Sequence, residues 1–304
     1  MGKTDWIASF IDSESLPQSY VDLVIDYFIP CAEYFVEFIC ENRRRGTPFL
    51  IGINGAQGTG KTTFAKFLSN YLMCFHNLNG CHLSLDDFYL TRSERQKRSR
   101  EVHPLFLVRG VPGTHDTDLA ISTVEKLKNL KTGGEMALPA FEKARDDRKP
   151  EHNWLKATGV QDFIIFEGWC VGSRPVPTST LARPINVLEK TKDQNGVWRN
   201  AVNNYLEEDY QKLFLLIDKL IFLKAPNFTS VIEWRKKQEE KLATVQQPDK
   251  SRIMTSSETA LFVQYFERIT RDNFINLPNI ADIVLQFGPD HKVVNKSYGS
   301  NHLN

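Results

Sequence analysis

One stretch of this sequence constrains the fold more than any other, IGINGAQGTGKTTF at residues 51–64. Residues 55–62 match the pattern Gly-x-x-x-x-Gly-Lys-Ser/Thr in full. A short, continuously apolar run at residues 48–53 precedes the glycines, and an apolar stripe of helical spacing follows them in residues 64–75. The order of buried strand, glycine loop and amphipathic helix predicts an α/β protein with a mostly parallel central sheet.

The glycines suit a loop that wraps its backbone N–H groups around phosphate oxygens, because glycine tolerates positive φ and lets the backbone approach closely. The positive end of the following helix faces the same anion. Lys61 would reach the β- and γ-phosphates, and the Thr62 hydroxyl would coordinate Mg²⁺. The predicted nucleotide-binding residues are Gly55, Ala56, Gln57, Gly58, Thr59, Gly60, Lys61, Thr62 and Thr63.

A chance glycine-rich turn and a dinucleotide-binding loop are the alternatives for these glycines, and both fit the sequence less well. A chance match requires neither a strand before it nor a helix after it, yet both are predicted here. A dinucleotide-binding loop of the type Gly-x-Gly-x-x-Gly gives Lys61 and Thr62 no role. The sequence therefore favours a nucleotide phosphate site.

The rest of the chain alternates between strand-like and helix-like segments. Strands are predicted at residues 81–86, 162–168, 218–225 and 281–287, and helices at residues 116–130, 228–245 and 256–274. Such alternation is typical of a parallel sheet covered on both faces. The expected fold class is a three-layer, P-loop NTPase-type α/β fold with helices on both faces of the sheet.

Composition and charge limit the classes of partner. Lys and Arg number 38 against 37 Asp and Glu, so the net charge of +1 gives no general attraction to nucleic acid or to an acidic membrane, and neither is expected as a partner. Residues 1–20 lack the apolar core of a secretory signal. Five cysteines without a Cys-x-x-Cys pair are typical of reduced intracellular thiols. The sequence predicts a cytoplasmic protein.

Acidic residues end two of the predicted strands. Because the carboxyl ends of parallel strands meet at one crevice, Asp86 and Glu167 are expected to face the phosphate site. Phosphoryl transfer to an alcohol needs one carboxylate at the hydroxyl and another on the side of the hydrated Mg²⁺. Asp86 is the candidate base and a candidate metal contact, with Asp87 as the local alternative, and Glu167 is the candidate metal carboxylate. Either aspartate could instead be a solvated strand end, and Asp87 could cap a helix that begins near Leu90.

The phosphate loop followed by SLDDFY and then IIFEGW resembles the small-molecule kinase family that includes phosphoribulokinase, uridine kinase and pantothenate kinase. The segments RGVPGTHD, LPAFEKARDDR, EGWCVG and EWRKKQE are similar to the glycerate kinase branch of that family, which includes plant D-glycerate 3-kinases, a yeast ATP-binding protein and bacterial relatives. The likeness covers about residues 48–288. It implies ATP and Mg²⁺ as cofactors, Asp86 as the base and a lid arginine, here Arg235, on the transferring phosphate. The predicted catalytic residues are therefore Asp86, Lys61 and Arg235.

Polar residues in these segments are candidate contacts to the acceptor. After a Pro-Gly turn, Arg109 offers a cation for a carboxylate, and His115 and Asp116 offer groups for hydroxyls. Asp116 could instead cap the helix that starts at Thr117. The other candidate acceptor contacts are Asp87, Tyr89, Lys143 and Arg145, of which the last two lie in a charged run of a kind that is usually solvated surface.

The domain organisation follows from the remaining segments. Residues 18–43 show a helical apolar period interrupted at Pro30, which predicts a helical hairpin or a kinked helix. We expect an N-terminal helical extension over residues 1–45 and a P-loop kinase domain over residues 46–304. Long irregular stretches in a compact domain are typical of binding loops or lids, and such insertions are expected near residues 137–159 and 171–215.

Together these features predict an ATP- and Mg²⁺-dependent kinase, a monomer or homodimer, that phosphorylates a small hydroxy acid, with D-glycerate as the expected acceptor. A kinase for another small alcohol (pantothenate, a nucleoside or a sugar phosphate) and a nucleotide-binding regulatory protein without transfer activity are the alternatives. A mechanical or signalling ATPase is disfavoured, because its metal-side strand would end in Asp rather than in Glu167. Two residues depart from the branch pattern Pro-Arg-Phe-Asp-Lys: Ala140 replaces the basic residue and Glu142 replaces the aspartate. Both lie in the expected substrate loop, so they weaken the assignment of glycerate as the acceptor more than the assignment as a kinase.

Overall fold

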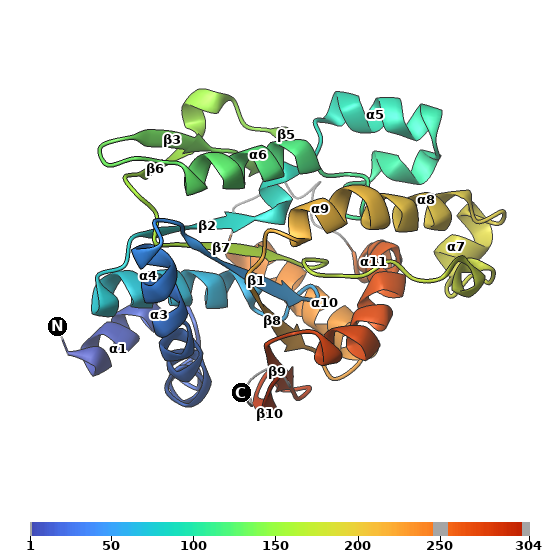
Figure 1. Cartoon of the computed structure of the whole chain (residues 1–304). Helices are drawn as coiled ribbons and strands as arrows, with labels where there is room; N and C mark the ends of the chain where they lie inside the picture. Colours follow the sequence, from blue (N-terminus) through green and yellow to red (C-terminus); the bar gives the residue numbers. More distant parts are fainter. Residues whose placement is uncertain (1, 246–254, 300–304) are drawn as a thin grey trace.

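Runs of β-branched and aromatic residues form the central sheet of the computed structural model, which describes residues 2–245 and 255–299. The strand order is β10-β9-β8-β1-β7-β2 (Figure 1). The strands are β1 (Phe49–Gly55), β2 (Gly80–Ser84), β7 (Phe163–Gly168), β8 (Lys219–Lys224), β9 (Ile283–Phe287) and β10 (Val293–Tyr298). Only β10, an unpredicted edge strand of this sheet, is antiparallel to its neighbour. The five predicted strands are all present, with ends shifted by at most two residues.

The order of the strands creates a switch point at β1. From β1 the chain crosses to the outer strand β2, returns to β7 beside β1, and then continues to β8 on the other side of β1. Ligands of doubly wound sheets bind in the crevice at such a point, outside the carboxyl ends of the strands. The glycine loop that follows β1 lies at this position.

Alternate side chains of the strands enter two separate cores, one on each face of the sheet. Ile51 and Ile53 of β1 join one core, which α3 (Ile29–Arg44), α4 (Lys61–His76) and α10 (Phe228–Val245) cover. Leu50 joins the other core, which α6 (Thr117–Lys128), α8 (Val197–Tyr205) and α9 (Gln211–Phe214) cover (Figure 1). The expected three-layer arrangement is therefore confirmed.

The N-terminal helices pack into the first of these cores. α1 (Lys3–Ser13) places Trp6 5.5 Å from the ring of Phe67 on α4. α2 (Tyr20–Leu23), the π-helical turn η1 (Val24–Phe28) and α3 follow one another without a break. The π turn ends two residues before Pro30, which cannot donate to the helical hydrogen-bond ladder. One continuous helix that contains a π-helical turn, rather than a hairpin, thus occupies residues 20–44.

The first long segment expected to be irregular contains two small hairpins. β3 (Glu135–Leu138) pairs with β6 (Leu155–Thr158), and β4 (Phe141–Glu142) pairs with β5 (Asp147–Arg148) between them. The remaining helical elements are η2 (Leu85–Phe88), α5 (Arg92–Glu101), η3 (Pro104–Leu107), η4 (Glu151–Asn153), η5 (Thr178–Leu181), α7 (Val187–Lys192), η6 (Leu206–Tyr210), α11 (Ser256–Asn276) and η8 (Leu277–Asn279). Within the described ranges no helix combines the length and apolar character needed to cross a bilayer.

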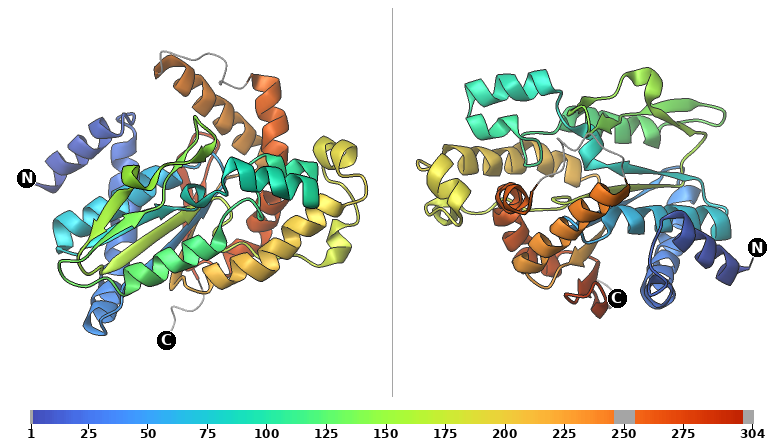
Figure 2. Two further views of the ribbon diagram at one scale, coloured as in Figure 1. Left: turned by 90° about the horizontal axis from the view of Figure 1, so that it is seen from above. Right: turned by 180° about the vertical axis from the view of Figure 1, so that it is seen from behind.

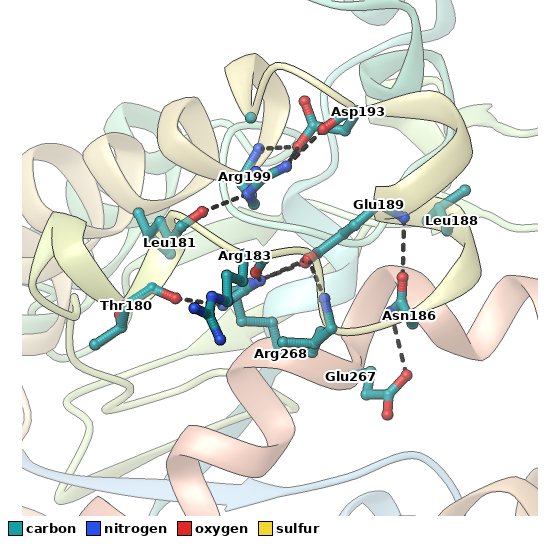
Figure 3. A network of polar contacts seen from close by, with 12 residues as sticks. Thr180, Leu181, Arg183, Asn186, Leu188, Glu189, Asp193, Arg199, Glu267 and Arg268 are labelled. Carbon is teal, nitrogen blue, oxygen red and sulfur yellow. Dashed lines mark hydrogen bonds and ion pairs between the residues drawn. The ribbon is translucent and has the colours of Figure 1, made fainter.

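The second long segment, residues 171–200, is joined to α11 by a buried ion pair (Figure 3). Glu189, which is 1% exposed, accepts hydrogen bonds from Arg268 of α11 at 2.8 and 2.6 Å. A second buried ion pair, between Asp193 Oδ2 and Arg199 Nη1 at 3.0 Å, lies within the segment and holds its own fold. This segment therefore braces α11, the helix beside α10 (Figure 2).

Candidate active site

The glycine loop joins β1 to α4 with a backbone that only glycine accommodates well. Gly58 and Gly60 have φ of 78° and 86°, in the left-handed region. A Cβ on Gly58 would lie 2.7 Å from the Cβ of Trp234. The Gly60 conformation lets α4 begin at Lys61. The first backbone N–H groups of α4, which have no partner within the helix, are therefore available to bind an anion held by the loop.

Six of the nine predicted loop residues line a cavity of about 280 Å³ at the carboxyl end of β1. These six are Gln57, Gly58, Gly60, Lys61, Thr62 and Thr63. Gly55, Ala56 and Thr59 lie beneath them: Ala56 and Thr59 are each 3% exposed, and the Thr59 hydroxyl donates to the Ala56 carbonyl at 2.8 Å. The loop thus has an inner layer that sets its shape and an outer layer that can meet a ligand.

Lys61, Thr62 and Glu167 form the cationic and metal-side part of the cavity. Lys61 Nζ donates to the Ala56 carbonyl at 3.3 Å, and burial lowers the pKa of Lys61 while Glu167 and Asp86 oppose that shift. The Thr62 hydroxyl donates to Glu167 Oε1 at 2.8 Å. Glu167, only 3% exposed, belongs to β7, which pairs with β1. A hydroxyl and a carboxylate side by side are hard oxygen ligands of the kind that Mg²⁺ takes together with phosphate oxygens and water, so the residues fit this ion.

Asp86 lies in η2 directly after β2 and faces the same cavity. Its Oδ2 accepts from Lys143 Nζ at 2.6 Å, and its Oδ1 accepts from the Tyr89 hydroxyl at 3.0 Å. Burial alone would raise the pKa of Asp86, but the adjacent Lys143 charge outweighs burial and holds this pKa well below its usual range. Asp86 is therefore ionised throughout the neutral range and available as an acceptor for a hydroxyl group.

Asp87 has a different environment although it is the next residue. Its Oδ1 accepts from the backbone N–H of Phe141 at 3.2 Å, which ties η2 to β4, and it is not among the cavity-lining residues. Burial raises the pKa of Asp87 to about 6. Its alternative role as a helix cap is wrong, because α5 begins at Arg92 and Thr91 caps it in a capping box with Glu94.

Arg109 and Lys143 supply positive charge at the end of the cavity near Asp86. Arg109 forms an ion pair with Asp146 and lies over the Phe141 ring, 5.6 Å from its centroid. The pKa of Lys143 is raised, chiefly by the charge of Asp86. Tyr89, 4% exposed, completes this side. Four predicted residues from three different loops thus meet in one place.

Three other candidate acceptor contacts lie outside the cavity lining. His115 is buried behind Tyr89, on which it stacks at 4.3 Å, and burial lowers its pKa to about 3. Asp116 caps α6 by accepting from the Leu119 N–H at 3.0 Å, so the capping alternative is correct. Arg145 has a 69% exposed side chain and pairs with Glu142 at 3.8 Å, as expected of solvated surface.

Arg235 of α10 also lines the cavity. It forms an ion pair with Glu239 one turn further along α10, and its Nη1 donates to Gln238 Oε1 at 3.0 Å. The Phe262 ring of α11 lies 5.9 Å from the guanidinium carbon. Burial lowers the pKa of Arg235 and Glu239 opposes this shift, so the arginine remains a cation at neutral pH.

Sequence reasoning missed an apolar wall of the cavity. Trp169 donates from Nε1 to the Gly110 carbonyl at 2.8 Å and packs edge-on against Phe266 of α11 at 4.9 Å. Trp169 belongs to the segment EGWCVG and follows Glu167 and Gly168 directly. This position next to the predicted Glu167 was the sequence feature that could have indicated its place in the site. The lining residues missed by sequence reasoning are Ser84, Gly168, Trp169, Gln238, Phe262 and Phe266.

An anion-binding loop and the carboxylate of Asp86 line the same cavity. Lys61 and Arg235 can balance the charge of phosphate oxygens, and Asp86 can hold a hydroxyl in line with them. Trp169 and Phe266 form an apolar part of the cavity wall. The geometry suits transfer of a phosphoryl group to an alcohol.

Comparisons with known proteins agree with this geometry. The KAP family P-loop domain matches residues 28–234, a span that contains the glycine loop and both strand-end acids. The chain is 31% identical over 262 residues to the uncharacterized kinase mug58 of Schizosaccharomyces pombe, which covers 82% of this chain and 87% of that protein. It is 33% identical over 196 residues to the chloroplastic D-glycerate 3-kinase of Arabidopsis thaliana, covering 62% of this chain but only 40% of that protein.

Solved structures show the same fold. The D-glycerate 3-kinase from Cryptococcus neoformans superposes with a TM-score of 0.70 at 22% identity, covering 88% of this chain and 99% of that one. Shorter matches of 129 and 130 residues relate the chain to a pantothenate kinase and a uridine kinase of bacteria. The chain, which carries the P-loop domain described for the KAP family, belongs to the P-loop kinases of the phosphoribulokinase and uridine kinase family.

Proposed function

We propose that the protein is an ATP- and Mg²⁺-dependent kinase that transfers the γ-phosphoryl group to a hydroxyl of a small hydroxy acid, with D-glycerate as the acceptor. The observation that carries the proposal is the contact of Lys143 with Asp86 at 2.6 Å inside a cavity that also holds Lys61 and Arg109. A base and two cations at the acceptor end match a substrate that has a hydroxyl group next to a carboxylate.

The size and charge of the part of the cavity near Asp86 favour a small anion as the acceptor. The cavity measures about 280 Å³ and must also admit the terminal phosphates, which leaves room for few further atoms. Arg109 is fixed by Asp146 and can present its remaining donors to a carboxylate in bidentate fashion. The D-glycerate 3-kinases among the relatives add weight to glycerate within this class.

The proposed mechanism is in-line transfer governed by positioning and charge. Asp86 accepts the hydrogen bond of the acceptor hydroxyl and takes its proton as the new P–O bond forms, while the bond between the γ-phosphorus and the bridging oxygen breaks and ADP leaves. Lys143, released from Asp86 when the hydroxyl binds, faces the acceptor carboxylate together with Arg109. Lys61 and Arg235 lie on the phosphate side and stabilise the charge on the equatorial oxygens. Mg²⁺, held by Thr62 and Glu167, would neutralise charge on the β- and γ-phosphates.

A coupled assay of ADP release tests the proposal with a panel of D-glycerate, pantothenate, uridine and ribulose 5-phosphate. We expect stimulation by D-glycerate and none by glycerol, which lacks the carboxylate. Lys143→Met should raise the KM for glycerate by about tenfold or more, the loss of one charge-assisted contact, and leave the KM for ATP unchanged. Turnover with another acceptor and none with glycerate would overturn the acceptor, and ATP binding without any product would support the regulatory alternative.

A further inference from the structure

Helix α10 packs directly on the phosphate loop at the residue that precedes Arg235. A Cβ on Gly58 would lie only 2.7 Å from the Cβ of Trp234, so the loop and the helix approach closely. Trp234 is 2% exposed, and its Nε1 donates to the Pro289 carbonyl at 3.0 Å. Because a close-packed, hydrogen-bonded side chain has little freedom to shift, the backbone of Arg235 has a set position relative to the loop.

The guanidinium group of Arg235 is held at both of its ends. Its Nη2 forms an ion pair with Glu239, and its Nη1 donates to Gln238 Oε1 at 3.0 Å. The Phe262 ring of α11 lies 5.9 Å from the guanidinium carbon. These contacts order a long side chain whose free rotation would otherwise oppose a fixed contact with phosphate.

Glu239 is buried, although it lies on a charged helix. The side chains of Arg235 and Glu239 are only 17% and 9% exposed, whereas the next residue, Glu240, is exposed. Among the described residues, Arg235 is the cation that pairs with Glu239. A helix gains little from an ion pair at this spacing, and burial of a charge costs free energy. The burial of Glu239 is therefore better explained by its effect on Arg235 than by helix stability.

The charges of the active-site cavity give Glu239 a second effect on Arg235. The cavity also holds the cations Lys61, Arg109 and Lys143. Asp86 raises the pKa of Arg235 and Arg109 lowers it, so the guanidinium lies within electrostatic reach of the acceptor end. A further cation at this place is repelled unless a carboxylate offsets its charge. Glu239 is outside the cavity lining, so it acts on the cavity through Arg235.

We propose that Glu239 is a positioning residue, which fixes the guanidinium of Arg235 for the transferring phosphate without a closing movement of α10. Glu239 and Gln238 each take one end of the guanidinium, which leaves further N–H donors for phosphate oxygens. Such a role rests on the proposed phosphoryl transfer and extends it to a residue that does not touch the substrate.

Steady-state kinetics of Glu239 variants test this role. Glu239→Gln removes the charge at nearly constant size and should lower kcat about tenfold. The KM values for ATP and the acceptor should stay within about twofold, because a misplaced contact to the transition state costs rate rather than ground-state binding. Glu239→Asp keeps the buried charge but shortens its reach, so kcat should fall here too, and this variant replaces Glu239→Gln if loss of the charge unfolds the protein. Glu240→Gln is the matched control: this neighbour is exposed and outside the cavity lining, and its loss should leave kcat unchanged.

Arg235→Met provides the background that separates positioning from a structural role. In this background Glu239→Gln should change kcat less than about twofold, whereas a structural role would lower kcat equally with and without the arginine. Calorimetric titration gives a second measurement that needs no acceptor. Glu239→Gln should weaken the binding of Mg²⁺-bound ADP with aluminium fluoride, a mimic of the transferring phosphate, about tenfold and leave the affinity for ADP alone unchanged.

An unchanged or higher kcat in Glu239→Gln, or equal losses of kcat in both backgrounds, would overturn the positioning role. A wild-type protein that phosphorylates no acceptor would instead overturn the proposed function. The titration with ADP and aluminium fluoride would then decide the role of Glu239, and equal affinity of wild type and Glu239→Gln for this mimic would exclude it.

Discussion

Asp86 and Asp87 are neighbours in the chain, yet their surroundings move their pKa values in opposite directions. The Lys143 charge lowers the pKa of Asp86, whereas burial raises that of Asp87 to about 6. The sequence could limit the base to this pair but could not choose between them. The choice depends on Lys143 and Phe141, which lie more than fifty residues further along the chain.

Substitution of each aspartate separates the two roles. Asp86→Asn should lower kcat by about 10²–10⁴-fold, the usual contribution of a positioned general base, while the KM for ATP stays near the wild-type value. Asp87→Asn, the matched control, should change kcat only slightly, because its side chain holds the Phe141 N–H rather than the substrate. Steady-state kinetics decide between them, and a greater loss of kcat in Asp87→Asn would assign the base to Asp87.

The raised pKa of Asp87 also predicts a pH dependence of stability. The folded protein keeps a proton on Asp87 up to pH of about 6, whereas the unfolded chain loses it near 3.8, so this contribution to stability is present at low pH and is lost as pH rises. His115 acts in the opposite sense, because burial lowers its pKa from 6.5 to about 3. Comparison with Asp87→Asn cancels the His115 effect.

The free energy of unfolding of wild type minus that of Asp87→Asn should therefore fall by about 1–2 kcal/mol between roughly pH 4 and pH 7, after allowance for the partial exposure of Asp87. Urea titrations at a series of pH values measure this difference. A difference that increases with pH would contradict the assignment of a raised pKa to Asp87.

At the scale of elements, the sequence predicted apolar periodic segments better than charged ones. The sequence of α5, RSERQKRSRE, has no apolar stripe, and a helix near Leu90 was considered only as one that Asp87 could cap. Its stability comes from the capping box at Thr91 and from Arg95, which is 1% exposed and donates to the Leu107 and Asp146 carbonyls at 2.7 Å. These partners are distant in sequence, so the local pattern carried no sign of them.

The same reason explains the missed wall of the active site. Phe262 and Phe266 lie in the helix predicted at residues 256–274, which the structure shows as α11, and both pack in the core. Their place beside Arg235 depends on how α11 is held, and the residues that hold it lie in the segment 171–200 (Figure 3). That segment was expected to be an insertion near the ligand, yet it lies in the described part of the chain and contributes no lining residue to the active-site cavity.

The ion pair between Glu189 and Arg268 should be necessary for the stability of this arrangement. Arg268→Met leaves a buried carboxylate without its partner and should lower the free energy of unfolding by about 3–5 kcal/mol. Lys156→Met, the control, removes an ion pair with Glu135 whose two side chains are 58% and 55% exposed, and it should cost about 1 kcal/mol or less. The double variant Glu189→Met/Arg268→Met should regain part of the loss. Urea denaturation provides the measurement, and equal losses in the two single variants would contradict this view of α11.

At the scale of the whole molecule, the sheet topology sets the relation between donor and acceptor. The loop after β1 lies at the switch point, with the carboxylate of β7 on one side and the Asp86 turn after β2 next to it. The sequence order of strand, loop and acidic strand ends was enough to predict this relation. The cavity of about 750 Å³ beside the phosphate loop was not predictable, because residues 16–27 and 290–293, which line it together with α10, are far apart in the sequence.

Because different residues bind the donor and the acceptor, the effect of each ligand on stability can be predicted. A ligand that binds only the folded state raises the free energy of unfolding by about 2.7 kcal/mol when its concentration is 100 times its Kd. Because Asp86 faces the acceptor and Lys61 faces the phosphates, Asp86→Asn should keep this gain with Mg²⁺-bound ATP, and Lys61→Met should lose most of it.

Urea denaturation of wild type and both variants, at one ATP concentration set by the wild-type Kd, measures these gains. Inorganic triphosphate serves as the control ligand, because Lys61→Met should reduce its gain as strongly as it reduces the gain from ATP. Loss of the ATP gain in Asp86→Asn to the same extent as in Lys61→Met would mean that Asp86 holds the donor. Asp86 would then belong to the nucleotide site, and the base would have to be sought among the other residues of the acceptor end.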